Sequence, residues 1–123
     1  MARILVVEDK DDHRRIICDM LRDEGYDVIE ATNGQEALER LQEVGEVDLV
    51  TLDEKMPVMT GLECLDAIRH TEGNEAIRNI PVLFLTVYRK PEITERKDVT
   101  VILKPYGYQE FLRAVKSALK KPL

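Results

Sequence analysis

Five short runs of apolar residues recur along the chain, and most of them are rich in β-branched side chains. They cover residues 4–7, 26–30, 47–52, 81–86 and 99–103. Their length and composition are typical of β-strands. Because the runs are almost uninterrupted by polar positions, they predict strands of a parallel sheet that is covered on both faces.

Between these runs, apolar residues repeat every three or four positions, which is the spacing of an amphipathic helix. The stretches with this spacing are residues 16–21, 37–41, 62–68 and 111–119. Predicted strands and helices therefore alternate along the chain. That alternation predicts an α/β fold, doubly wound, whose strands are joined by right-handed crossovers.

Three local signals mark where the predicted helices begin and end. Asn33 precedes Glu36 by three residues, and Thr60 precedes Glu63 by three. At this spacing an N-cap side chain and a carboxylate can satisfy the free backbone N–H groups of a helix start. Gly25 follows the first helical stretch and suits the left-handed residue that often ends a helix.

Polar residues stand where the predicted strands end, and ligands of such sheets bind beyond the carboxyl ends of the strands. These residues are Glu8, Asp9, Asp53, Thr86 and Lys104. Carboxylates brought close together raise one another's pKa unless a cation compensates. Mg²⁺ prefers oxygen ligands, so the three acids predict a magnesium site. Zinc and nucleotides lack support, since no His or Cys joins the acids and no GxxxxGK[ST] loop occurs.

Each of these residues also has an ordinary interpretation. An acidic pair is most often a solvated loop, a threonine can bond backbone, and a lone lysine is usually a surface charge. Asp11 and Asp12 fit the first turn of a helix, where the dipole favours negative charge. His13 and His70 have no partner at motif spacing and are interpreted as solvated or partly packed. The joint placement at four strand ends favours the functional interpretation.

Composition narrows the class of protein. The 123 residues include 18 Lys and Arg against 24 Asp and Glu, and the net charge of −6 argues against direct nucleic-acid binding. Cys18 and Cys64 lack metal or disulfide spacing and are interpreted as reduced core thiols. No stretch approaches the ~20 apolar residues of a membrane span, and no signal peptide is evident. We therefore expect one cytoplasmic domain over residues 1–123, either standing alone or cut from a longer protein, without a membrane partner.

Taken together, the strand-end residues and their flanks resemble the receiver domain of two-component response regulators. The segments that carry the resemblance are ILVVEDK (4–10), LVTLDEKMPVMTGLE (49–63), PVLFLTV (81–87) and LKPYG (103–107). The resemblance covers essentially the whole chain. It implies a flavodoxin-like sheet of five parallel strands in the order 2-1-3-4-5.

The resemblance also implies a signalling function. Asp53 corresponds to the phosphoacceptor, which takes a phosphoryl group from the phosphohistidine of a histidine kinase or a histidine phosphotransfer protein. Thr86 and Lys104 correspond to residues that bind phosphoryl oxygens, and Pro105 to a position with a cis peptide bond. Such a domain catalyses only its own phosphorylation and dephosphorylation, and it acts through an unknown downstream protein.

Further roles implied by the resemblance concern the metal and the lifetime of the phosphoryl group. Asp9, Asp53 and the backbone carbonyl of Lys55 correspond to ligands of Mg²⁺, and Glu8 acts mainly through water. Lys55 and Tyr88 flank the expected phosphoryl group and are expected to control the access of water to it.

The chain departs from the family pattern in two places. Only 18 positions separate Thr86 from Lys104, which predicts a short or irregular fourth helix. Val101 stands where many relatives have an aromatic residue that turns inward. We expect phosphorylation to reorder residues 86–98 instead, with Tyr88 or Tyr106 as a substitute aromatic.

Two other functions compete with the phosphorylated receiver. The unusual fourth-helix region, which carries Arg89, Lys90, Arg96 and Lys97, could serve a protein-interaction module that keeps the receiver fold but needs no phosphorylation. A small phosphohydrolase is weaker, because Lys55 stands where a second carboxylate would follow the nucleophile.

Overall fold

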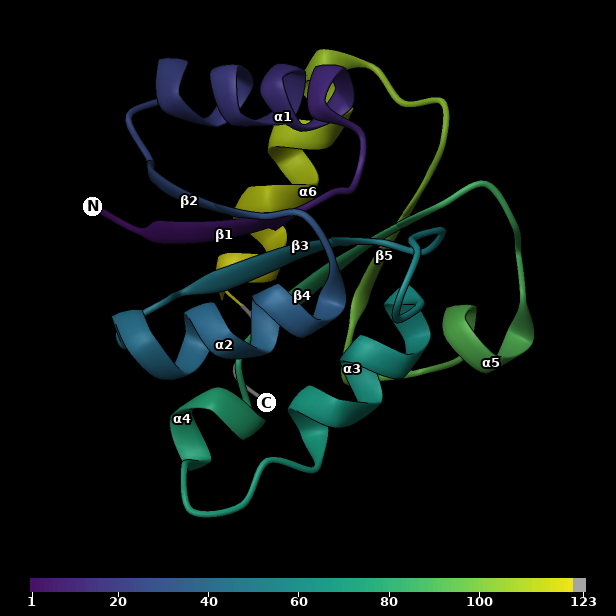
Figure 1. Cartoon of the computed structure of the whole chain (residues 1–123). Coiled ribbons are helices and arrows are strands. Elements are labelled where there is room, and N and C mark those ends of the chain that lie inside the picture. Colours follow the sequence, from purple (N-terminus) through teal and green to yellow (C-terminus); the bar gives the residue numbers. More distant parts are fainter. Residues whose placement is uncertain (121–123) are drawn as a thin grey trace.

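A computed structural model describes residues 1–120 of the chain. Five parallel strands form one sheet in the order β2-β1-β3-β4-β5, and helices cover both faces (Figure 1). The strands are β1 (Arg3–Val7), β2 (Asp27–Ala31), β3 (Leu49–Asp53), β4 (Val82–Thr86) and β5 (Thr100–Leu103). The predicted α/β class and strand order are both confirmed.

Six helices occur within the described residues. They are α1 (Asp11–Asp23), α2 (Gly34–Val44), α3 (Gly61–Arg69), α4 (Glu75–Arg78), α5 (Pro91–Thr94) and α6 (Tyr108–Lys120). The sheet separates two apolar clusters: Ile4 and Val6 of β1 pack with α1 and α6, whereas Leu5 and Val7 pack with α2 and α3. This alternation follows from the two-residue period of a strand.

The helix boundaries follow the predicted signals with one difference. Thr60 and Glu63 form the complete reciprocal pair at the start of α3. The side chain of Asn33 accepts from the N–H of Glu36 at 2.8 Å, but the Glu36 carboxylate accepts from Thr32, one residue earlier than predicted. Gly25 follows α1 with a φ of +92°, as the left-handed interpretation requires.

The connection between β4 and β5 contains only the four-residue helix α5, so the predicted short fourth helix is confirmed. One side chain of α5, Ile93, is buried in the core. The end of this connection is held by Arg69, whose guanidinium donates to the carboxylate of Asp98 at 3.1 Å and to its carbonyl at 2.5 Å. Arg96 bonds the same carboxylate at 2.6 Å, so this member of the predicted basic surface is paired.

Other expectations about the core also hold. Cys18 and Cys64 are free and buried, and burial raises the pKa of Cys64 to about 12. Within residues 1–120, no helix is both long and apolar enough to cross a bilayer.

Candidate functional site

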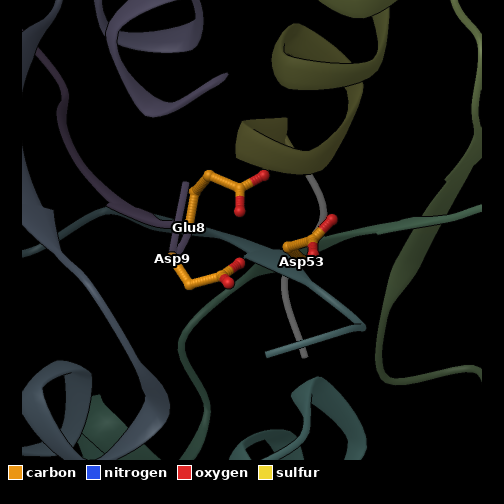
Figure 2. Close-up of side chains that lie close together, drawn as sticks. All are labelled: Glu8, Asp9 and Asp53. Atoms are coloured by element: carbon orange, nitrogen blue, oxygen red, sulfur yellow. The ribbon is translucent and has the colours of Figure 1, made fainter. Parts of the chain in front are cut away.

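Three carboxylates converge at the carboxyl ends of β1 and β3. Figure 2 shows the side chains of Glu8, Asp9 and Asp53 close together, and an oxygen of each lies within 4.8 Å of the others. Glu8 and Asp53 are only 2% and 4% exposed. The neighbouring strands β1 and β3 pair with Val7 opposite Leu52, which explains why the residues that follow them meet.

The three carboxylates of the cluster disfavour one another's ionisation. Burial, hydrogen bonding to Asp9 and the charge of Asp53 together raise the pKa of Glu8 to about 7, and burial is the largest of these causes. Oδ1 of Asp9 is buried and has no hydrogen-bond partner in the part of the chain that the structure describes. An all-oxygen donor set with one unsatisfied buried oxygen fits a hard divalent cation such as Mg²⁺.

Lys104 brings a positive charge to the same cluster. Its ammonium group donates a hydrogen bond to Oδ1 of Asp53. Its backbone N–H donates to the carbonyl of Thr86 at 2.8 Å, which fixes the end of β5 against the end of β4. The Lys104–Pro105 peptide bond is cis, as the resemblance implies.

Thr86 is buried at the end of β4, and its hydroxyl is engaged by another acid. Oγ1 of Thr86 donates to Oε2 of Glu54 at 2.6 Å, while the N–H of Tyr88 donates to Thr86 Oγ1 at 3.1 Å. The ammonium group of Lys90 lies 3.3 Å from the other oxygen of Glu54. It also lies 5.3 Å from the centre of the Tyr88 ring.

All five strand-end residues line one cavity of about 810 Å³. Lys55 and Tyr88 line it as well, together with apolar side chains such as Met56 and Leu62. The structure therefore brings together every side chain that the sequence placed in the site. Only Pro105 lies outside the cavity wall, beside Lys104.

Asp11 and His13, interpreted from the sequence as residues without a role in the site, lie close to it along the chain. Asp11 is exposed and accepts a hydrogen bond from Arg14 at 2.6 Å, so it belongs to the first turn of α1, as predicted. His13 was expected to have no acidic partner, but its Nδ1 lies 3.8 Å from Oε1 of Glu8. Sequence spacing missed this pair because Glu8 follows β1 and His13 lies in α1, so their distance depends on how the chain passes from the strand into the helix.

Glu54 and Lys90 are the site residues that sequence reasoning did not identify. Glu54 directly follows Asp53, so the rule that strand-end residues share one edge could have included it. Lys90 lies in the irregular connection after β4, where no periodicity predicts side-chain direction.

The comparisons with known proteins agree with this geometry. A family model for the response regulator receiver domain matches residues 4–116. The chain is 37% identical to the chemotaxis protein CheY of Pseudomonas aeruginosa over 112 residues, which cover 87% of each protein. It is 32% identical to the transcriptional regulatory protein PdtaR of Mycobacterium tuberculosis over 124 residues, and it spans only 57% of that protein.

Solved structures show the same likeness. CheY4 of Vibrio cholerae is 30% identical with a TM-score of 0.82, and the match covers 96% of this chain and 98% of that one. TrrA of Thermotoga maritima, in complex with Mg(2+)-BeF, is 32% identical with a TM-score of 0.81. That match covers 96% of this chain and 99% of TrrA.

Proposed function

Because the chain belongs to the family of response regulator receiver domains, we propose that it takes up a phosphoryl group on Asp53. The donor is the phosphohistidine of a histidine kinase or a histidine phosphotransfer protein. The observation that carries this proposal is the convergence of Asp53 with Glu8, Asp9 and Lys104 at one edge of the sheet. Receiver domains are signalling domains, so the modified protein acts through altered contacts with a partner.

In the proposed reaction, a carboxylate oxygen of Asp53 attacks the phosphorus of phosphohistidine. The new O–P bond forms an acyl phosphate as the N–P bond breaks, and the departing imidazole nitrogen keeps the electron pair and takes up a proton. Such transfers need alignment and neutralisation of the phosphoryl oxygens more than covalent assistance. Lys104 supplies a positive charge beside the nucleophile, and Thr86 supplies a hydroxyl donor.

The residues that would hold Mg²⁺ are Asp9 and Asp53, with the Lys55 carbonyl as a third ligand and Glu8 acting mainly through water. The unsatisfied oxygen of Asp9 and the raised pKa of Glu8 support this assignment. When bound, the ion neutralises charge on the transferring phosphoryl oxygens.

A mass measurement tests the proposal. The protein is incubated with Mg²⁺ and acetyl phosphate, and its intact mass is expected to rise by one phosphoryl group. Asp53→Ala should show no adduct, while Asp19→Ala, which removes an exposed acid of α1, should react like the parent. Absence of an adduct with every donor would contradict the proposal and favour a receiver fold that binds partners without phosphorylation.

Hydrolysis of the acyl phosphate returns the domain to its starting state. Lys55 and Tyr88 line the cavity that holds Asp53, which supports the proposal that they control the access of water. Lys55→Ala and Tyr88→Ala are expected to change the decay rate of the adduct while leaving thermal unfolding nearly unchanged. Decay rates equal to that of the parent in both variants would contradict this role.

A further inference from the structure

Glu54 holds the hydroxyl group that the phosphoryl site needs. Its side chain is 14% exposed, and its two oxygens contact Thr86 Oγ1 at 2.6 Å and Lys90 Nζ at 3.3 Å. We propose that Glu54 is a latch, a positioning residue that engages Thr86 until a phosphoryl group on Asp53 displaces it. This inference rests on the proposed function of Asp53.

The competition follows from the hydrogen-bonding capacity of a hydroxyl group. Thr86 has one hydroxyl proton, so it cannot donate fully to Glu54 and to a phosphoryl oxygen at once. The bond to Glu54 is short and its acceptor is charged, which places it among the stronger hydrogen bonds. A phosphoryl group must therefore break the Thr86–Glu54 hydrogen bond in order to bind. The free energy of breaking it lowers the affinity of the site for the phosphoryl group.

The latch also connects the site to the segment after β4. The N–H of Tyr88 donates to the Thr86 hydroxyl, and Lys90 contacts both Glu54 and the Tyr88 ring. Residues 86–90 are therefore tied to Glu54 at both ends, through the Thr86 hydroxyl and the Lys90 ammonium group. When Thr86 turns to a phosphoryl oxygen, the N–H of Tyr88 loses its acceptor, and Glu54 with its partner Lys90 is released from Thr86.

The far end of the same connection is held independently of the latch. Arg96 donates to Asp66 at 2.6 Å and to Asp98 at 2.6 Å, and Asp66 belongs to α3. The change should therefore be confined to residues 86–94, which is narrower than the segment expected from the sequence. Tyr106 stacks on Phe111 with ring centres 5.3 Å apart, so Tyr88 is the aromatic residue that responds.

Binding of beryllofluoride, a phosphoryl mimic, tests the latch. Affinity is measured with Mg²⁺ present by NMR titration of the ¹⁵N-labelled protein, which also reports on the amides of residues 86–94. Glu54→Ala is expected to bind about tenfold more tightly, because the mimic no longer has to displace a charge-assisted hydrogen bond. Glu54→Gln keeps the side-chain length without the charge and should show a smaller gain.

Two further variants separate the latch from general charge effects. Glu92→Ala removes an exposed acid from α5 and should bind like the parent. In a Thr86→Ala background, removal of Glu54 should produce no gain, because the competing hydroxyl is already absent. Thermal unfolding of each variant shows whether it folds.

The outcomes are distinct. Equal or weaker binding by both Glu54 variants would overturn the latch, and so would a gain that persists without the Thr86 hydroxyl or appears equally in Glu92→Ala. In those cases the parent still binds the mimic, and the proposed function stands. If no variant binds beryllofluoride, both the latch and the proposed function fail.

Discussion

The ammonium group of Lys104 donates a hydrogen bond to Oδ1 of Asp53, although β4 lies between β3, which ends at Asp53, and β5, which Lys104 directly follows. Asp53 is 6% exposed as a side chain, whereas Lys104 is 28% exposed and can exchange this contact with solvent. Lys104 therefore offsets part of the negative charge gathered around Asp53. It also bonds the carboxylate that we propose as a metal ligand.

Lys104→Ala is expected to have opposite effects on the two ligands of the site. Phosphorylation by acetyl phosphate should slow about 100-fold, the magnitude typical for loss of one positioned charge or donor. Mg²⁺ should bind more tightly, since the competing ammonium is gone. Intact mass over time and an NMR titration with Mg²⁺ measure the two quantities. Loss of Mg²⁺ binding in this variant would contradict competition for Asp53.

Mg²⁺ is expected to stabilise the folded protein, because a ligand that binds only the folded state raises the free energy of unfolding. At ten times the dissociation constant the gain is about 1.4 kcal/mol. Thermal unfolding with and without Mg²⁺ measures it. Asp9→Asn should remove the gain, while Asp11→Asn, which changes an exposed acid outside the cluster, should keep it. An equal gain in both variants would mean that the ion binds elsewhere.

Much of the fold was predictable because the buried strands are short apolar runs and the long helices have clear apolar faces. Helices α4 and α5 have only four residues each. The short interval between Thr86 and Lys104 predicted that α5 would be short or irregular. Helix α4 was not predicted, because a single helical turn shows no hydrophobic periodicity. The site residues were predictable because parallel strands end at one edge. The contacts of Glu54 with Thr86 and Lys90 were not, because they depend on side-chain directions in an irregular connection.

Ionisation of Asp98 makes the free energy of unfolding depend on pH in the acid range. Hydrogen bonding to Arg96, together with the charges of Arg96 and Arg69, lowers its pKa to about 2 from 3.8. The folded-state pKa lies below the unfolded one, so the stabilisation is complete above about pH 4 and is lost as the pH falls toward 2. Because the carboxylate is about one third exposed, we expect Asp98→Asn to cost about 1–2 kcal/mol at pH 7.

Urea unfolding of the parent and of Asp98→Asn at several pH values checks this. The difference between the two proteins should shrink as the pH falls from 4 to 2. Glu95→Gln, an exposed acid next to Arg96, is the control and should have little effect at any pH. A difference between parent and Asp98→Asn that stays constant with pH would show that the Arg96 pair contributes nothing through ionisation.

Thr51 is a polar residue within an apolar layer. It lies in β3 between Val6 of β1 and Leu83 of β4, and its buried hydroxyl has no hydrogen-bond partner among residues 1–120. Thr51→Val replaces an unsatisfied hydroxyl by a methyl group, so it should raise the free energy of unfolding by about 1 kcal/mol. Thr71→Val removes a hydroxyl that donates to Ala67 and should not stabilise. Destabilisation by Thr51→Val would reveal a partner for the hydroxyl.

Gly61 allows the start of α3 to approach the end of β3 closely. Its N–H donates to the Glu54 carbonyl at 2.8 Å, and an added Cβ would lie 2.8 Å from Cα of Glu54 and still closer to the Asp53 carbonyl oxygen. These are backbone atoms that cannot rotate away. Gly61→Ala must therefore displace the backbone of Asp53 and Glu54. We expect it to cost about 1–3 kcal/mol of stability, as overpacking does.

The same backbone shift misplaces Asp53 relative to Asp9. Mg²⁺ should therefore raise the free energy of unfolding of Gly61→Ala by less than it does for the parent. Gly107→Ala is the matched control, since a Cβ at Gly107 meets nothing within 4 Å. It should change stability by less than about 0.5 kcal/mol and leave the Mg²⁺ effect intact. If Gly61→Ala unfolded like this control and kept full Mg²⁺ protection, the close approach would not position the site. The loop between Glu54 and Gly61 would then have moved to make room for the added methyl group.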